Sequence, residues 1–124
     1  MLAGAERPLL HAGVGLSWAA AWDEFLALAD HLAAAMTTSL AARGVVPEDH
    51  PRYFHPLNRD ALEAARTEAD VVLVVGGRLG ELDNWGRAPS WGDPAQQKVI
   101  HVDADPTSIS LNRPVDLGIV GDAR

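Results

Sequence analysis

The sequence predicts an α/β fold, a Rossmann-like three-layer αβα domain with a mostly parallel sheet of five to six strands. Two observations predict it. Short β-branched runs alternate along the chain with segments of helical periodicity. The run 71–75 is continuously apolar, which is typical of a strand covered on both faces. We expect residues 1–124 to form a single domain, because domains usually have ~100–200 residues.

The first half of the chain predicts two strands and one helix. Residues 8–12 form an apolar run that ends in a glycine turn, so we expect a buried strand there. Apolar residues then recur at spacings of three and four over 19–34, which predicts a helix. Residues 36–39 are a weaker strand candidate, and the glycine and prolines over 44–56 predict a loop.

The second half predicts three more strands separated by helices and one long surface loop. Pro106 favours a helix start because proline is well tolerated at the first helical position. The expected elements are a helix over 59–69, a strand over 70–75, a loop to residue 94, a strand over 98–103, a short helix from Pro106 and a strand over 117–120.

Composition excludes several classes of protein. The chain has no cysteine, which removes disulfides and thiolate metal sites. Its net charge is −7 and its basic residues are scattered singly, so we expect no nucleic-acid partner. No apolar run is longer than that of 71–75, which is far shorter than the ~20 residues that cross a bilayer, so we expect no membrane partner. The start lacks the pattern of a signal peptide, and we expect a cytoplasmic protein.

Candidate binding residues lie where the predicted strands end, because ligands of parallel α/β sheets bind at the carboxyl edge. Gly13 and Gly15 follow the first strand, and they predict either a tight structural turn or a phosphate site at a helix start. Gly77 and Arg78 follow the central strand. There the alternatives are a phosphate clamp and a turn with a solvated arginine.

Two acids lie at and just past the end of the fourth predicted strand. Asp103 is a candidate for binding a ribose hydroxyl, as acids at this position do in Rossmann-like domains, with a structural role as the alternative. Asp105 is a second candidate, although capping the helix expected at Pro106 explains it better.

The remaining conspicuous residues are histidines and tryptophans. The five histidines have no metal-ligand spacing and are expected to be structural, and no serine lies in a nucleophile elbow. Trp85 and Trp91 stand in the glycine- and proline-rich loop. They either fold back on their own domain or bury against another subunit, since tryptophan is enriched at interface hot spots.

Several segments together resemble a known family. They are Arg7-Pro8-Leu9-Leu10-His11-Ala12-Gly13-Val14-Gly15, Met36-Thr37-Thr38 followed by Pro47-Glu48-Asp49-His50-Pro51, Ala69-Asp70-Val71 through Gly77-Arg78, and Ile100-His101-Val102-Asp103-Ala104-Asp105-Pro106 followed by Asn112-Arg113-Pro114-Val115-Asp116 and Gly121-Asp122-Ala123. In this order and spacing they are similar to the central domain of thiamine-diphosphate-dependent enzymes. That group includes acetolactate synthase, pyruvate oxidase and benzoylformate decarboxylase.

The resemblance implies a six-stranded parallel sheet in a domain that sits between two cofactor-binding domains. In the parent enzyme those neighbours hold thiamine diphosphate and magnesium, and this chain alone is expected to bind neither. Some members bind FAD or an adenine nucleotide in this domain, at positions that match Gly77, Arg78, Asp103 and Asp105 here. This chain departs from them over 53–59, where it has no glycine. Without glycine the backbone does not easily approach a pyrophosphate.

We therefore expect a non-catalytic structural central domain of a decarboxylase or acetolactate synthase-like enzyme. The alternative is a stand-alone nucleotide-binding module for FAD or ADP. The expected partners are other domains or subunits of such an enzyme, and we also expect a homo-oligomer with the Trp85–Trp91 loop at its contact.

Overall fold

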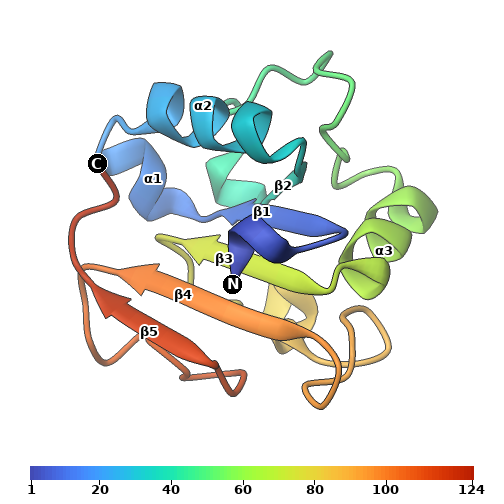
Figure 1. Ribbon diagram of the computed structural model, residues 1–124. Helices are drawn as coiled ribbons and strands as arrows, with labels where there is room; N and C mark the ends of the chain where they lie inside the picture. The colour runs from blue at the N-terminus through green and yellow to red at the C-terminus, as the bar shows by residue number, and fades with distance from the viewer.

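A computed structural model describes all residues, 1–124. Its centre is one parallel five-stranded sheet in the order β2-β1-β3-β4-β5 (Figure 1). The strands are β1 (Pro8–Ala12), β2 (Ala35–Thr38), β3 (Val71–Val75), β4 (Lys98–Asp103) and β5 (Leu117–Val120). The predicted α/β class and all five strands are confirmed, each strand within about a residue of its expected bounds.

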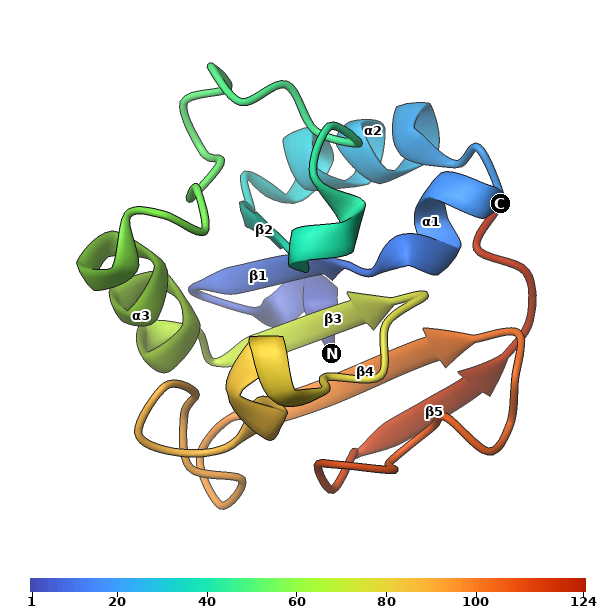
Figure 2. The same cartoon turned by 180° about the vertical axis from the view of Figure 1, so that it is seen from behind.

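Helical segments cover both faces of this sheet. The α-helices are α1 (Val14–Trp18), α2 (Trp22–Leu32) and α3 (Arg59–Glu68), and the short 3₁₀ helices are η1 (Leu2–Gly4), η2 (Leu40–Ala42) and η3 (Glu81–Gly86). The helices α1 and α2 lie on one face, and α3 and η3 on the other (Figures 1 and 2). This is the three-layer arrangement that the sequence predicts.

Each face has its own core because strand side chains alternate between faces. On the face of α1 and α2, Leu10 and Leu73 pack with Phe25 of α2 in the larger hydrophobic cluster. On the opposite face, Leu9 and Val72 pack with Trp91 in a smaller cluster. The β3 strand is buried at all five positions, as its continuous apolar run predicts.

The helix predicted over 19–34 is confirmed as α2, but the expectation of only one helix between the first two strands is wrong, because α1 precedes it. The α1 helix ends in a Schellman motif: Ala20 has a φ of 52°, its N–H donates to Ser17 O, and the Ala21 N–H donates to Leu16 O. A second such motif at Ala33, with a φ of 50°, ends α2. Alanine favours a continuous helix, so periodicity alone does not reveal these ends.

The short helix predicted from Pro106 is also wrong. Residues 104–113 form successive turns instead of a helix. The Asp105 carboxylate accepts hydrogen bonds from the N–H and Oγ1 of Thr107, at 2.9 and 2.7 Å, so Asp105 caps a turn. Ser110 then adopts a positive φ of 61°, which takes the chain out of helical geometry.

The segment predicted as a surface loop to residue 94 contains η3 and buries several side chains. Leu79, Asp83 and Trp91 are each less than 10% exposed. The predicted surface loop is therefore partly buried.

None of the helices combines the length and the apolar character that a membrane span requires.

Candidate functional site: the carboxyl edge and a buried polar cluster

The turns after β1 and β3 touch each other at the carboxyl edge of the sheet. A Cβ added at Gly13 would lie 2.3 Å from Gly76 O and 2.3 Å from Gly77 Cα. The Gly15 N–H donates to Gly76 O at 2.9 Å. Only glycines permit this approach of two backbones, so turn-to-turn packing by itself accounts for Gly13 and Gly77. Phosphate binding at these glycines stays a prediction.

This contact predicts a large effect for one methyl group. Gly13→Ala should lower the free energy of unfolding by about 3 kcal/mol or by more, because both clashing atoms belong to backbone that cannot rotate away. Urea unfolding followed by circular dichroism measures it. The matched control is Gly80→Ala, where an added Cβ meets nothing within 4 Å. Equal, small effects of the two substitutions would contradict the packing explanation.

The six predicted site residues do not converge on one crevice. Gly13, Gly77 and Arg78 line a cavity of about 530 Å³, together with Trp85 and Asn112. Gly15 and Asp103 line a second cavity of about 180 Å³ next to Trp18. Asp105 lines neither cavity and is exposed.

Asp103 and its neighbour His101 stabilise the turns of this edge. The Asp103 carboxylate accepts a hydrogen bond from the Asp105 N–H at 2.9 Å. His101 Nε2 donates to Gly77 O at 2.7 Å. Burial lowers the pKa of His101, and this outweighs the opposite effects of Gly77 and Asp103, so the ring is neutral near pH 7. Asp103 and His101 therefore both have hydrogen-bond partners within the fold.

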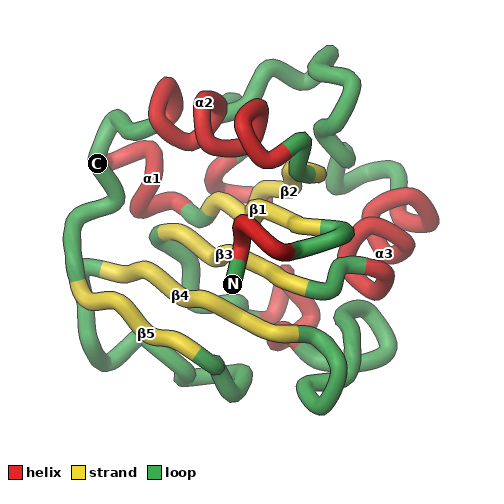
Figure 3. The backbone as a smooth tube through the Cα atoms, viewed as in Figure 1, coloured by secondary structure: helices red, strands yellow, loops and turns green.

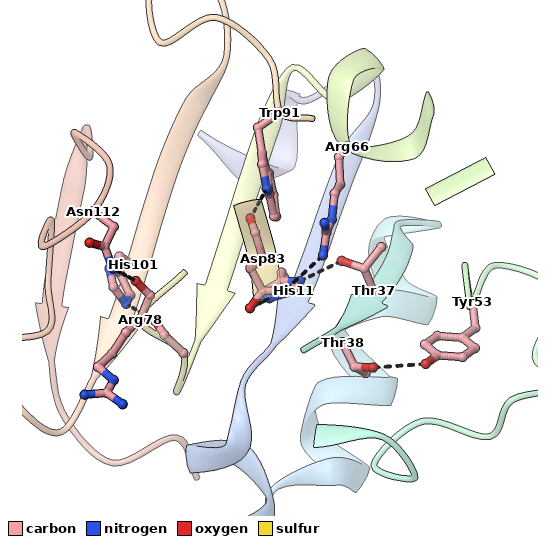
Figure 4. Close-up of polar contacts among 11 residues, drawn as sticks. His11, Thr37, Thr38, Tyr53, Arg66, Arg78, Asp83, Trp91, His101 and Asn112 are labelled. Carbon is pink, nitrogen blue, oxygen red and sulfur yellow. Dashed lines mark hydrogen bonds and ion pairs between the residues drawn. The ribbon is translucent and has the colours of Figure 1, made fainter. Parts of the chain in front are cut away.

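A buried polar cluster that the sequence analysis missed lies on the α3 side of the sheet (Figure 4). The Arg66 guanidinium donates to Asp83 Oδ1 at 3.0 Å, and the pair is nearly inaccessible to solvent. His11 Nε2 lies 3.5 Å from Asp83 Oδ2, and its Nδ1 is hydrogen-bonded to Thr37 Oγ1 at 2.8 Å. These residues come from β1, β2, α3 and η3.

Trp91 packs against this cluster and contacts three of its residues. Its Nε1 donates to Asp83 O at 2.7 Å, and the Arg66 guanidinium lies 4.5 Å from its ring centroid. The His11 ring meets it edge to face at 5.4 Å. Trp91 therefore folds back into its own domain, and its predicted place at a subunit interface is wrong. Trp85 remains 47% exposed.

The buried cluster makes the stability of the fold depend on pH in the acidic range. Burial raises the pKa of Asp83, but His11 and Arg66 together outweigh it and hold the pKa below the ordinary aspartate value. Because the folded-state pKa is the lower one, this stabilisation is complete above the unfolded pKa of ~3.9 and is lost as pH falls through the folded pKa.

We therefore expect the free energy of unfolding to fall more steeply below about pH 4 in the natural chain than in the double variant Arg66→Met, Asp83→Leu, which removes both charges. Urea unfolding at pH 6, 4 and 3 measures the difference between the two proteins. Parallel pH profiles would contradict the role of the buried pair.

No group of three or more histidine, aspartate or glutamate side chains is placed to hold a metal ion. The domain is thus Rossmann-like, with two cavities at the carboxyl edge, glycine turns closed on each other and a buried Arg66–Asp83 ion pair. These features define its class as a three-layer α/β domain. Comparison with known proteins identifies the family within that class.

The family model described as "Thiamine pyrophosphate enzyme, central domain" matches residues 1–124, and the chain belongs to this family. The chain is 35% identical over its full length to a protein assigned as an acetolactate synthase large subunit of Methanocaldococcus jannaschii, and 36% identical over 99% of its length to the sulfoacetaldehyde acetyltransferase of Rhodobacter capsulatus. It is 37% identical over its full length to a 2-hydroxyacyl-CoA lyase of Oryza sativa.

A solved structure agrees with the sequence relatives. A protein assigned as a thiamin diphosphate-dependent enzyme from Mycobacterium smegmatis superposes with a TM-score of 0.76 at 30% identity, covering 98% of this chain and 24% of that one. The chain spans about a fifth of the relatives: 21%, 21% and 20% of the three proteins above. Other domains of a thiamine-diphosphate enzyme are therefore its implied partners. The alternative of a stand-alone nucleotide-binding module is not favoured.

The residues of this chain do not themselves fit thiamine diphosphate. A glycine turn holds a diphosphate through backbone N–H groups that are free to point at it. Here the N–H groups of Gly13 and Gly15 already donate to Val75 O and Gly76 O, and the two turns are packed against one another.

Proposed function

We propose that residues 1–124 act as a single, non-catalytic structural domain of a cytoplasmic enzyme that depends on thiamine diphosphate and magnesium. The parent enzyme is a lyase or transferase of the decarboxylase or acetolactate synthase kind. This domain holds the cofactor-binding domains in their relative positions. Its own residues take no part in the chemical step.

One observation carries the proposal. The family match covers the whole chain but only about a fifth of the relatives, and the described residues include no assembled catalytic set. His11, Asp83 and Arg66 are the side chains best suited to acid–base chemistry, and each is less than 10% exposed. Asp83 contacts both His11 and Arg66. Such contacts within the fold support a structural role for these groups.

The test is a turnover assay of the purified chain with pyruvate, thiamine diphosphate and magnesium. We expect neither carbon dioxide release nor acetolactate formation. An enzyme with established acetolactate synthase activity, assayed in parallel, is the positive control. Turnover by the chain alone would contradict the proposal.

Self-association of the chain is a further part of the proposal, and because Trp91 is buried it now rests on Trp85 and Leu82. Trp85 and Leu82 of η3 are 47% and 75% exposed, and apolar side chains gathered on one loop favour a partner. Trp85→Ser should shift the light-scattering mass toward the monomer at high micromolar concentration while the circular dichroism spectrum stays unchanged. A natural chain that is already monomeric there would contradict this contact.

A further inference from the structure

The segment that carries Asp83 is fixed to the domain at its two ends. It is η3, a short helical segment between two stretches of loop, on the face of the sheet opposite α2 (Figures 2 and 3). At one end, Leu79 is 3% exposed and packs in the smaller hydrophobic cluster. At the other end, Gly86 O accepts a hydrogen bond from Arg113 Nη1 at 2.6 Å. We call residues 81–85, which lie between these ends, the strap.

The strap has a single buried side chain. Asp83 is 7% exposed, whereas the other four residues of the strap are exposed. Its carboxylate oxygens lie 3.0 Å from Arg66 Nη2 and 3.5 Å from His11 Nε2 (Figure 4). Its carbonyl accepts the Trp91 indole N–H at 2.7 Å. Among the side chains of the strap, only Asp83 therefore anchors it to the sheet.

The backbone of the strap is strained. Asn84 and Trp85 have φ angles of 54° and 56°, and Leu79, just before the strap, has a φ of 50°. Residues other than glycine are disfavoured in this left-handed region and stay there only where the surrounding structure holds them. Because the strap has one anchor, its strain acts against the contacts of Asp83.

Cavities lie on both sides of the strap. One cavity, of about 300 Å³, is lined by Leu82 and Arg66, and another, of about 530 Å³, is lined by Glu81 and Trp85. Asp83 lines both of them. It is therefore part of the wall between the two cavities, and moving it away would join them.

We propose that the strap opens as a unit while the rest of the domain stays folded. In the open state Asp83 leaves its partners, the left-handed residues relax, and the two cavities join into one groove with Arg66 in its wall. Leu79 and Gly86 keep the ends of the strap attached, so the opening requires no unfolding of the sheet. Such a device controls access to the groove, which goes beyond a structural role.

Hydrogen exchange of the natural chain, followed residue by residue by NMR, tests the opening. The amide N–H groups of Asp83 and Trp85 both donate to Gly80 O. The Trp91 indole N–H donates to Asp83 O, so it too is protected while the strap is closed. We expect these three N–H groups to exchange with one common opening constant that urea barely changes, as in a local opening.

The amides of β3 provide the reference for global unfolding. They should exchange about a hundredfold more slowly or slower still, and with a steep dependence on urea, because they open only when the domain unfolds. If the three N–H groups exchange at the rate of β3 and with the same dependence on urea, the strap does not open separately and the proposal is overturned. Three unrelated opening constants would overturn it as well.

A pair of substitutions tests the strain. Trp85→Gly and Trp85→Ala both remove the indole and differ by one methyl group, but only glycine adopts a positive φ without strain. We expect the Asp83 amide to be about threefold or more better protected in Trp85→Gly than in Trp85→Ala. Ala64 is exposed in α3, where the order is reversed, so Ala64→Gly should lower the protection of the α3 amides. Equal protection in the two Trp85 variants would contradict the strain and overturn the proposal.

A variant of the anchor completes the test. Asp83→Asn keeps the size of the side chain and removes its charge, so the opening constant of the strap should rise about tenfold or more relative to that of β3. An unchanged opening constant would overturn the proposal. If this variant fails to fold, the exchange of the natural chain still decides the question. None of these measurements involves thiamine diphosphate or turnover, so their outcome is independent of the proposed function.

Discussion

Replacing Trp91 by alanine is expected to lower the free energy of unfolding by about 3–5 kcal/mol. The indole is 1% exposed, so its removal leaves a cavity at the centre of the smaller hydrophobic cluster. The change also removes the hydrogen bond to Asp83 O and the ring above Arg66. Urea unfolding followed by circular dichroism measures the loss.

Two substitutions separate the contributions at this site. Trp91→Phe keeps an aromatic ring and loses the hydrogen bond, so it should cost distinctly less than alanine. Trp85→Ala removes a tryptophan that is 47% exposed from the same segment and should cost under about 1 kcal/mol. If Trp85→Ala were the more damaging change, the assignment of Trp91 to the core would be wrong.

Removing the Asp83 carboxylate is the second large expected effect. Asp83→Ala leaves the Arg66 guanidinium buried without its counter-charge, and loss of one partner of such a pair typically costs about 3–5 kcal/mol. It also weakens the attachment of η3 to the sheet, because Asp83 joins η3 to His11 and Arg66. Chemical unfolding measures the stability, and amide hydrogen exchange over 81–86 measures the attachment.

The double variant Arg66→Met, Asp83→Leu is the informative control for this pair. Replacing both charges by apolar groups of similar size avoids the uncompensated charge and should cost much less than Asp83→Ala. A double variant as unstable as Asp83→Ala would show that the cost comes from losing the pair and its packing and not from an uncompensated Arg66 charge.

The strands could be predicted because their signal is local. The run 71–75 is apolar at every position, and the structure buries every one of those residues in β3. The helix ends could not be predicted in the same way. Ala20 and Ala33 adopt positive φ in Schellman motifs, although alanine is the strongest helix former. Tertiary packing overrides propensity there.

The buried polar cluster could not be predicted from the sequence for a different reason. His11 was expected to be structural, and Trp91 was one of two conspicuous tryptophans, but nothing local connects residue 11 with residues 66, 83 and 91. Parallel topology brings them together only once β1, α3 and η3 are in place. The predicted site residues divide between two cavities at the carboxyl edge, and Asp105 lines neither of them.

The most direct test of the account is a thermal-shift titration of the chain with thiamine diphosphate plus magnesium, FAD and ADP, each at millimolar concentration. A structural domain that leaves cofactor binding to its neighbours should show no change in melting temperature with any of them. Ligand at ~100 times its dissociation constant stabilises a fold by ~2.7 kcal/mol, which is a shift of several degrees. Such a shift, abolished by Arg78→Ala or Asp103→Asn, would contradict the account and assign the carboxyl edge to a ligand.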